Sequence, residues 1–171
     1  VAVLIIVMSV MNGFRTELVN KILGFNPHII VEPYSKKIDL SEKKNIKKNS
    51  LFKELILTNS GEGVLINKDY TKGIVLRGYS KKDFSKLEII KQENFTGNSN
   101  NLIDYNISIG KELSYSLNLK LGDKIIIMSP SGVGTIIGNL PKQQTFIVSS
   151  IFDSGLADFD QNIAFININS L

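Results

Sequence analysis

The chain has 171 residues and a formal net charge of +4, with 43% hydrophobic and 21% charged residues. This is enough apolar material for the core of one ordinary domain or two small subdomains, and too much for an intrinsically disordered chain. The sequence contains no cysteine and a single histidine, His28. Disulfides, thiol catalysis and cysteine-ligated zinc are therefore excluded, and most hydrolase triads and multi-histidine metal sites are disfavoured.

The basic charge does not indicate a nucleic-acid partner. All but two of the 20 basic residues are lysine, and the two arginines are Arg15 and Arg77. Arginine is the side chain best suited to bidentate recognition of bases and phosphates. Aromatic residues that would stack on bases do not interleave with the lysine clusters. We therefore expect no binding to nucleic acid.

Residues 1–11, VAVLIIVMSVM, form an almost unbroken apolar run. As a helix this run would span about 16 Å, roughly half of a hydrocarbon core near 30 Å thick. It therefore fits the end of a transmembrane helix. Two alternatives remain at this point, namely a buried helix of a soluble domain and the apolar core of a signal sequence.

The pattern becomes amphipathic directly after this run. Phe14, Leu18 and Ile22 recur at helical spacing, and polar residues occupy the other faces. A helix that leaves the lipid and enters water should change in this way. We expect residues 1–24 to be the end of a first transmembrane helix that continues without a break into a stalk.

Short β-type runs separated by turn residues follow. Expected strands are residues 28–32, 52–58, 63–67, 73–77, 124–128, 144–152 and 163–168. Expected helices are residues 41–50, a short helix capped by Ser80, and residues 110–118. Expected turns and loops are residues 59–63, 94–106, 129–142 and 153–162. Many short strands with few helices predict an α+β fold and not a series of βαβ units.

The motifs that would carry enzyme chemistry are incomplete. The glycine-rich residues 132–138 are not followed by the Lys-Ser/Thr pair that a phosphate-binding loop needs. Asp153, Asp158 and Asp160 lack the spacing of a calcium loop, so we expect solvated loop carboxylates. His28 has no metal-type partner near it in sequence. We therefore predict no catalytic residue, no metal site and no cofactor.

The Gly/Pro-rich residues 129–142 form the most unusual segment, because they leave one expected strand and return to another. Ile136, Ile137 and Leu140 lie within it. Apolar residues at the tip of a protruding loop are typical of a partner-binding site. The alternative is that these three side chains fold back onto the core.

Several segments together resemble the LolC/LolE-type permease subunits of the lipoprotein-releasing ABC transporter. The signature SVMNGF…ILG…PH near the N-terminus is the most specific part. The segments that carry the resemblance are residues 7–31, 73–80 (GIVLRGYS), 109–148 and 151–166 (IFDSGLADFDQNIAFI).

The resemblance implies a non-catalytic permease subunit of the bacterial inner membrane with a large periplasmic domain of the MacB-like class. Such a transporter extracts lipoproteins from the inner membrane and passes them to a periplasmic carrier, LolA. The implied partners are this LolA-like carrier, a LolD-like ATPase subunit, a second permease subunit and the lipoprotein substrate.

The family's domain is described as two small α+β subdomains, one inserted in the other. By this resemblance, residues 25–171 form the periplasmic domain. Residues 27–60 would begin the membrane-proximal subdomain. Residues 61–168 would form the inserted, β-rich subdomain, with residues 129–142 as the hook loop that recruits the carrier.

The hook assignment implies a set of carrier-binding residues with an apolar centre and a polar rim. These are Ile136, Ile137, Leu140 and Pro141, with Lys142 and Gln143 as the rim. The chain departs from the LolC pattern in two places: Ile136 stands where the hook tip has proline, and Gln144 where an arginine follows the conserved glutamine. Both changes put carrier affinity in question.

Two other functions fit the same sequence features. A MacB-like efflux or signalling permease would have the same membrane architecture without needing a carrier hook. A secreted binding module would instead lose the N-terminal segment by cleavage near residues 10–25.

Overall fold

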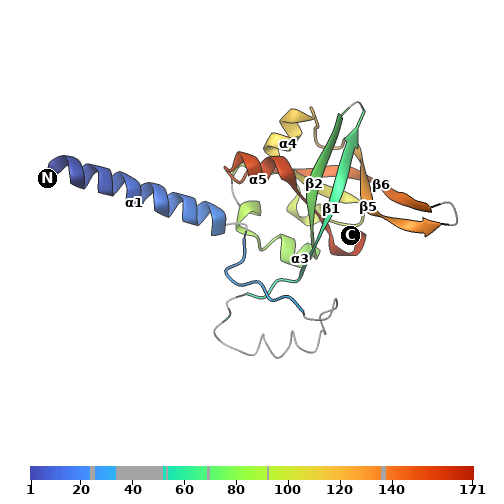
Figure 1. Ribbon diagram of the computed structural model, residues 1–171, viewed down its shortest axis with the longest axis horizontal. Coiled ribbons are helices and arrows are strands. Elements are labelled where there is room, and N and C mark those ends of the chain that lie inside the picture. The colour runs from blue at the N-terminus through green and yellow to red at the C-terminus, as the bar shows by residue number, and fades with distance from the viewer. Residues whose placement is uncertain (24–25, 34–51, 53, 69, 92, 136–137) are drawn as a thin grey trace.

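The structure is a computed structural model that describes residues 1–23, 26–33, 52, 54–68, 70–91, 93–135 and 138–171 (Figure 1). An apolar helix extends from one side of a β-rich body, and a long β-hairpin extends from the other. The expected helix at 41–50 and the predicted tip residues Ile136 and Ile137 lie outside the described residues.

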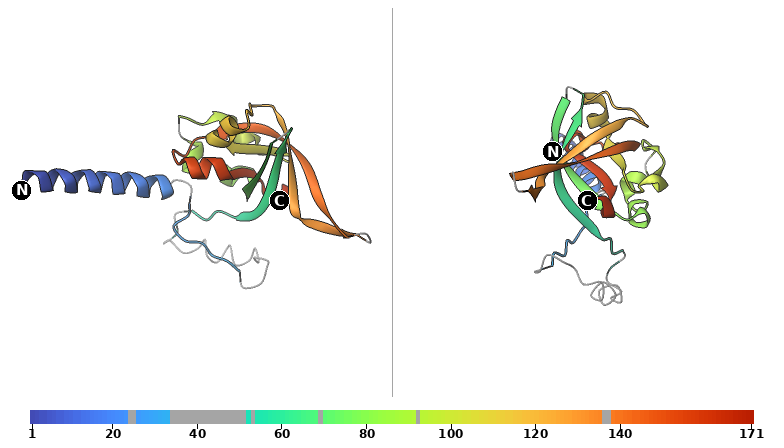
Figure 2. Two further views of the ribbon diagram at one scale, coloured as in Figure 1. Left: turned by 45° about the horizontal axis from the view of Figure 1, so that its top comes forward. Right: turned by 90° about the vertical axis from the view of Figure 1, so that its right-hand side faces the viewer.

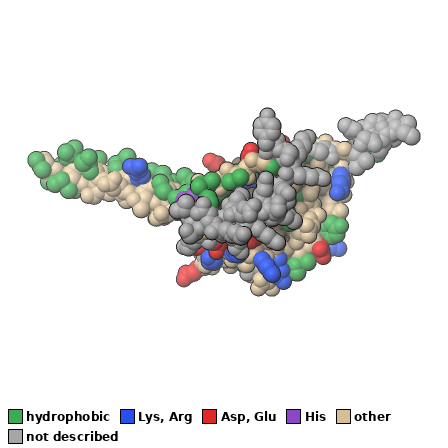
Figure 3. Space-filling model, turned by 90° about the horizontal axis from the view of Figure 1, so that it is seen from below, with side chains coloured by type: hydrophobic (Ala, Val, Ile, Leu, Met, Phe, Trp, Pro, Cys, Tyr) green, Lys and Arg blue, Asp and Glu red, His purple; other side chains and the backbone are tan. Residues whose placement is uncertain are grey.

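Helix α1 (Ala2–Leu23) is a single 22-residue helix, which confirms the prediction of an unbroken helix through the amphipathic segment. At 1.5 Å per residue it is about 33 Å long. None of its residues is buried, and it is long and apolar enough to cross a membrane. Hydrophobic side chains follow the helix away from the body, as the space-filling view in Figure 3 shows.

The body is built on a β-barrel. Its strands are β1 (Thr58–Asn67), β2 (Tyr70–Tyr79), β4 (Asn106–Gly110), β5 (Lys124–Thr135), β6 (Gly138–Phe152) and β7 (Ile163–Asn167). They pair in the order β6-β4-β7-β2-β1-β5, and pairing of β5 with β6 closes the sheet on itself. The pairs β2/β7 and β4/β6 are parallel and the others are antiparallel, while the short β3 (Thr96–Gly97) adds to β6.

The interior of the barrel is filled by alternate residues of every strand, as a period of two requires. Helix α4 (Lys111–Ser116) follows β4 directly and adds its own leucine to this core. The buried interior residues include Leu65, Leu76, Ile107, Ile109, Leu113, Ile125, Ile127, Phe146, Val148 and Ile166. The barrel is therefore a packed core and not a pore.

A second apolar layer covers part of the barrel's outer surface. It is formed by α3 (Lys81–Phe84), the 3-10 turn Glu88–Ile90 and α5 (Ala157–Asn162), which pack over outward-facing residues of the sheet. Phe165 lies between the interior residues Ala164 and Ile166 on β7 and so faces this outer layer. The aromatic residues of the layer include Tyr79, Phe84, Phe152, Phe159 and Phe165.

The mixed, β-rich architecture after an apolar helix confirms the predicted α+β class. Ser80 caps α3 by accepting from the Asp83 amide, as expected for that position. The strand predicted at 28–32 is wrong, because these residues are in no regular element. The strand predicted at 52–58 is also wrong, because β1 begins only at Thr58.

The turn predicted at 59–63 is wrong for a physical reason. These residues belong to β1, where a Cβ on Gly63 would lie 2.9 Å from Ile127 Cγ2. The glycine is there because the neighbouring side chain approaches closely, and not because the chain reverses. The segment 94–106 contains β3 and the 3-10 turn Ser99–Asn101, and the connection at 153–162 contains α5. All described strands lie between residues 58 and 167, and the division into two subdomains stays a prediction.

Candidate partner-docking arm

The segment predicted as a loop, residues 129–142, consists of two paired strands in its described part, residues 129–135 and 138–142, so this prediction is corrected. Strands β5 and β6 continue beyond the barrel and pair with each other, with Ser129 opposite Lys142 and Thr135 opposite Gly138. We call residues 129–142 the arm. Figure 2 shows that its two strands project together from the barrel.

Proline and glycine at these positions predict a loop, but the structure places both prolines and Gly132 at an irregularity of the ladder. Between the pairs Ser129–Lys142 and Val133–Leu140, three residues of β5 face one residue of β6. Pro130 lies on the longer side, and Pro141 is the single residue opposite. Proline has no N–H to donate to a ladder, so a bulge is where a sheet tolerates it.

The described residues of the predicted site are all accessible. The Leu140 side chain is 53% exposed and does not fold back onto the core. Pro141, Lys142 and Gln143 are exposed as well. Because successive side chains of a strand alternate, Leu140 and Lys142 share one face of the ribbon, and Pro141 and Gln143 share the other. The structure thus brings the residues to one arm but not to one face.

At the base of the arm, neighbouring side chains of β6 differ in their exposure to solvent. Gln144 lies opposite Ile127, whose side chain is in the barrel interior, and is half-buried. Gln143 is on the outer face, where its Nε2 lies 3.9 Å from Met128 Sδ. Gln144 is therefore directed toward the barrel side of the ribbon, and Gln143 is directed toward solvent.

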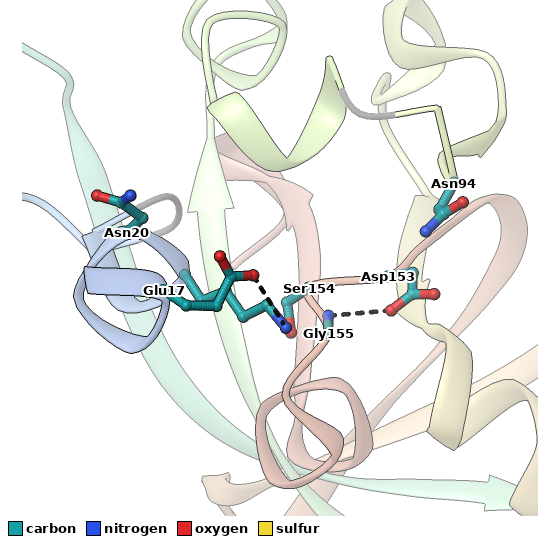
Figure 4. A pocket seen from close by; sticks show the side chains of 7 residues that line it. Glu17, Asn20, Asn94, Asp153, Ser154 and Gly155 are labelled. Carbon is teal, nitrogen blue, oxygen red and sulfur yellow. Dashed lines mark hydrogen bonds and ion pairs between the residues drawn. The ribbon is translucent and has the colours of Figure 1, made fainter. Parts of the chain in front are cut away.

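A second polar region lies at the other end of the body, where α1 meets the barrel (Figure 4). The turn Asp153–Gly155 follows β6 and faces Glu17 and Lys21 of α1 across a shallow pocket. A Cβ on Gly155 would lie 3.3 Å from Lys21 Cε, so the lysine stem covers this turn. Arg77 Nη1 donates to Asn26 Oδ1 at 3.2 Å. These contacts hold the end of α1 against the body.

Two of the three aspartates of this region, Asp153 and Asp160, are not the solvated carboxylates that the sequence predicted. Lys111 Nζ donates to Asp153 Oδ2 at 2.8 Å, and this hydrogen bond lowers the pKa of Asp153 below its usual value. Asp160 is buried and accepts from the amide and hydroxyl of Ser154, the hydroxyl at 2.6 Å. Burial raises the pKa of Asp160. Only Asp158 is exposed as expected.

The buried Asp160 was missed because its role depends on a distant close contact. A Cβ on Gly110 would overlap the backbone of Asp160, which shows how tightly α5 packs at the start of α4. Nothing in the local sequence indicates that contact. No group of three His, Cys, Asp or Glu side chains that could hold a metal is found in the described ranges.

Sequence comparison relates the chain to the class of protein that its motifs resemble, the permease subunits of lipoprotein release. No family model matches the chain. Curated relatives do match over essentially its whole length. All of those reported below carry the description lipoprotein-releasing system transmembrane protein LolC.

The relative from Xylella fastidiosa (strain Temecula1) is 24% identical over 100% of this chain and 42% of its own length. The relative from Neisseria meningitidis serogroup B is 25% identical over 98% of this chain and 41% of its own. The relative from Haemophilus influenzae is 28% identical over 100% of this chain and 43% of its own. These matches confirm the resemblance to LolC-type subunits, of which the chain spans less than half.

Among solved structures, the extracellular domain of the noncanonic ABC-type transporter YknZ from Gram-positive bacteria matches with a TM-score of 0.49 and 16% identity. The match covers 84% of this chain and 65% of that domain.

Proposed function

We propose that the chain is part of an ABC transporter permease that releases lipoproteins from the bacterial inner membrane. Helix α1 crosses that membrane, and residues 25–171 stand in the periplasm. The similarity to LolC proteins over essentially the whole chain supports this proposal, together with a 22-residue apolar helix that has no buried residue. The division into a membrane-proximal part at 27–60 and an inserted part at 61–168 belongs to the same proposal.

In this proposal the arm is the docking site for a LolA-like periplasmic carrier. The observation that carries it is the position of the arm, which projects from the barrel on the side opposite α1 (Figure 1). A hairpin in that place reaches away from the membrane and offers exposed apolar groups to a partner. The proposed contacts are Ile136, Ile137, Leu140 and Pro141, with Lys142 and Gln143 at the rim.

The remaining roles follow from a permease that couples to other subunits. In this proposal ATP hydrolysis takes place in a separate, LolD-like subunit, as the similarity to transmembrane LolC proteins suggests. A second permease subunit, identical or related, completes the membrane part. The chain itself is non-catalytic, and its task is to hold the carrier while the lipoprotein is passed on.

The test is carrier binding to the full-length permease complex in detergent. Leu140→Asp places a charge on the exposed apolar side chain, and we expect carrier affinity to fall at least about tenfold. Tyr115→Asp is the matched control, because Tyr115 is 70% exposed but lies on α4, away from the arm. The double variant Ile136→Asp/Ile137→Asp should abolish binding.

Unchanged binding by Leu140→Asp and by the double variant would reject the arm as the docking site. A complex that binds no carrier at all would favour the efflux or signalling permease. N-terminal sequencing that showed cleavage near residues 10–25 would favour the secreted module.

A further inference from the structure

Gly132 lies at the irregularity of the arm and faces the backbone of the opposite strand. A Cβ at this position would overlap the carbonyl oxygen of Leu140 and would lie 2.8 Å from its carbonyl carbon and 3.2 Å from Pro141 N. All three are backbone atoms, so no flexible side chain can move aside to relieve the overlap. The two strands approach each other here more closely than any residue with a side chain allows.

The reason for glycine at this position is space and not backbone angle. Gly132 is not in the left-handed region of φ, unlike Gly97, Gly122 and Gly155. Replacing it with alanine therefore adds a steric contact without adding torsional strain. The effect of such a substitution reports on the strand approach alone.

Few hydrogen bonds support the arm at the same point. Pro130 and Pro141 have no N–H to contribute to the ladder, and regular pairing resumes only at Val133 and Leu140. A two-stranded ribbon is at best marginally stable alone. Within the part of the chain that the structure describes, no third strand pairs with residues 129–142. The close contact at Gly132 is therefore well placed to set the direction of the tip.

We propose that Gly132 is a positioning residue of the arm: its contact with the Leu140–Pro141 peptide sets the bend at the bulge and thereby the direction of the tip. The inference for carrier binding rests on the proposed function, whereas the inference for arm geometry does not. In the same view, Pro141 serves docking by permitting the bulge as well as by its exposed surface.

A Cβ at Gly132 must move Leu140 away until ordinary contact is reached, at about 3.4 Å from its carbonyl carbon. The separation opens the ribbon at the bulge. Thr135, the last residue of β5, lies about 10 Å beyond this point, at 3.3 Å for each of three residues. Separation of the strands at the bulge therefore displaces the far end of the arm, without any substitution beyond the bulge.

The experiment compares Gly132→Ala with Gly73→Ala in the full-length permease complex. Gly73 lies on β2, and a Cβ there would meet nothing within 4 Å, so it is a matched control for a glycine in a strand. We expect Gly132→Ala to bind the carrier at least about tenfold more weakly than wild type. Gly73→Ala should bind within twofold of wild type.

Arm geometry is measured separately by disulfide formation, since the chain contains no cysteine of its own. One engineered pair, Ser129→Cys/Lys142→Cys, lies on the barrel side of the bulge. The other, Val133→Cys/Leu140→Cys, lies on the tip side. In the Gly132→Ala background, the yield of the tip-side disulfide should fall severalfold while the barrel-side yield is retained. The retained barrel-side disulfide also shows that the variant has folded.

The two readouts separate the inference from the proposed function. Unchanged tip-side crosslinking in Gly132→Ala overturns the positioning role, whatever happens to carrier binding. Altered crosslinking with wild-type carrier affinity overturns the link between arm direction and docking. Altered crosslinking in a complex whose wild-type form binds no carrier supports the geometric role and rejects the proposed function.

Discussion

Phe165 lies on the outer face of β7, at the centre of the aromatic layer that joins α3 and α5 to the barrel. It is fully buried. Its ring centroid lies 4.8 Å from that of Phe152, and 5.7 Å from those of Tyr79 and Phe84. Phe159 of α5 is 6.4 Å away. Replacing Phe165 with alanine therefore removes the group that the whole layer shares.

The expected loss of stability follows from these contacts. A buried phenylalanine replaced by alanine costs about 3–5 kcal/mol, because apolar contacts are lost and a cavity is left. We expect Phe165→Ala to lower the free energy of unfolding by about 4 kcal/mol, which is about 8–16 °C in Tm for a chain of this size.

The assay is urea unfolding of the detergent-solubilised protein, combined with hydrogen exchange of its peptides. Amides of α3 and α5 should lose protection first, since their packing surface is removed. Phe146→Ala is the matched control, because Phe146 is also buried but faces the barrel interior. Its ring centroid lies 6.1 Å from that of Tyr105. It should instead reduce protection in the barrel strands.

A loss of less than about 1 kcal/mol in Phe165→Ala would refute the view that this layer is packed as a unit. Equal loss of protection in the barrel interior and in the outer helices would refute the separation into two clusters.

Two further predictions concern the carboxylates near α1, whose pKa values are shifted in opposite directions. Lys111→Met removes the partner that lowers the pKa of Asp153. The Lys111–Asp153 pair stabilises the fold fully above the unfolded pKa of about 3.9, and this stabilisation is lost as the pH falls through the lower pKa of the folded state. The variant should show a lower urea midpoint than wild type at pH 7 and the same midpoint near pH 2; a difference that persists in acid contradicts this. Asp160→Asn removes a carboxyl whose pKa is raised by burial. The contribution of Asp160 to folding stability is therefore full below the unfolded pKa of about 3.9 and is lost as the pH rises through the higher pKa of the folded state. Wild type should therefore lose stability relative to this variant between pH 4 and pH 7, and an opposite slope in the same unfolding series would contradict the prediction.

Features that depend on neighbouring residues in sequence were predicted well. Helix α1, the Ser80 cap and the runs of branched aliphatic residues in β2 and β5 each contain their own signal. The short α5 gives no comparable signal, because its sequence ADFDQN is mostly polar and its one buried residue is Asp160. That burial depends on Ser154 and on the approach of Gly110, which only the tertiary structure brings near.

The arm shows the same division between local and distant information. Composition singled out residues 129–142, since glycine, proline and apolar residues are unusual together. The composition predicted a loop, because Pro130 and Pro141 are unfavourable in a regular strand. Only the cross-strand register shows that both prolines meet at one bulge. The alternation of Leu140 and Gln143 between the two ribbon faces likewise depends on strand pairing.

One uninterrupted strand, β6 (Gly138–Phe152), makes up half of the arm and then a wall of the barrel, and it ends one residue before the Asp153–Gly155 turn beside Lys21. At about 3.3 Å per residue, its 15 residues reach roughly 50 Å. A force that pulls on either end would act along this strand and would be resisted by its cross-strand hydrogen bonds with β4 and β5. The strand is thus one continuous covalent path between the arm and the turn that lies beside the end of α1.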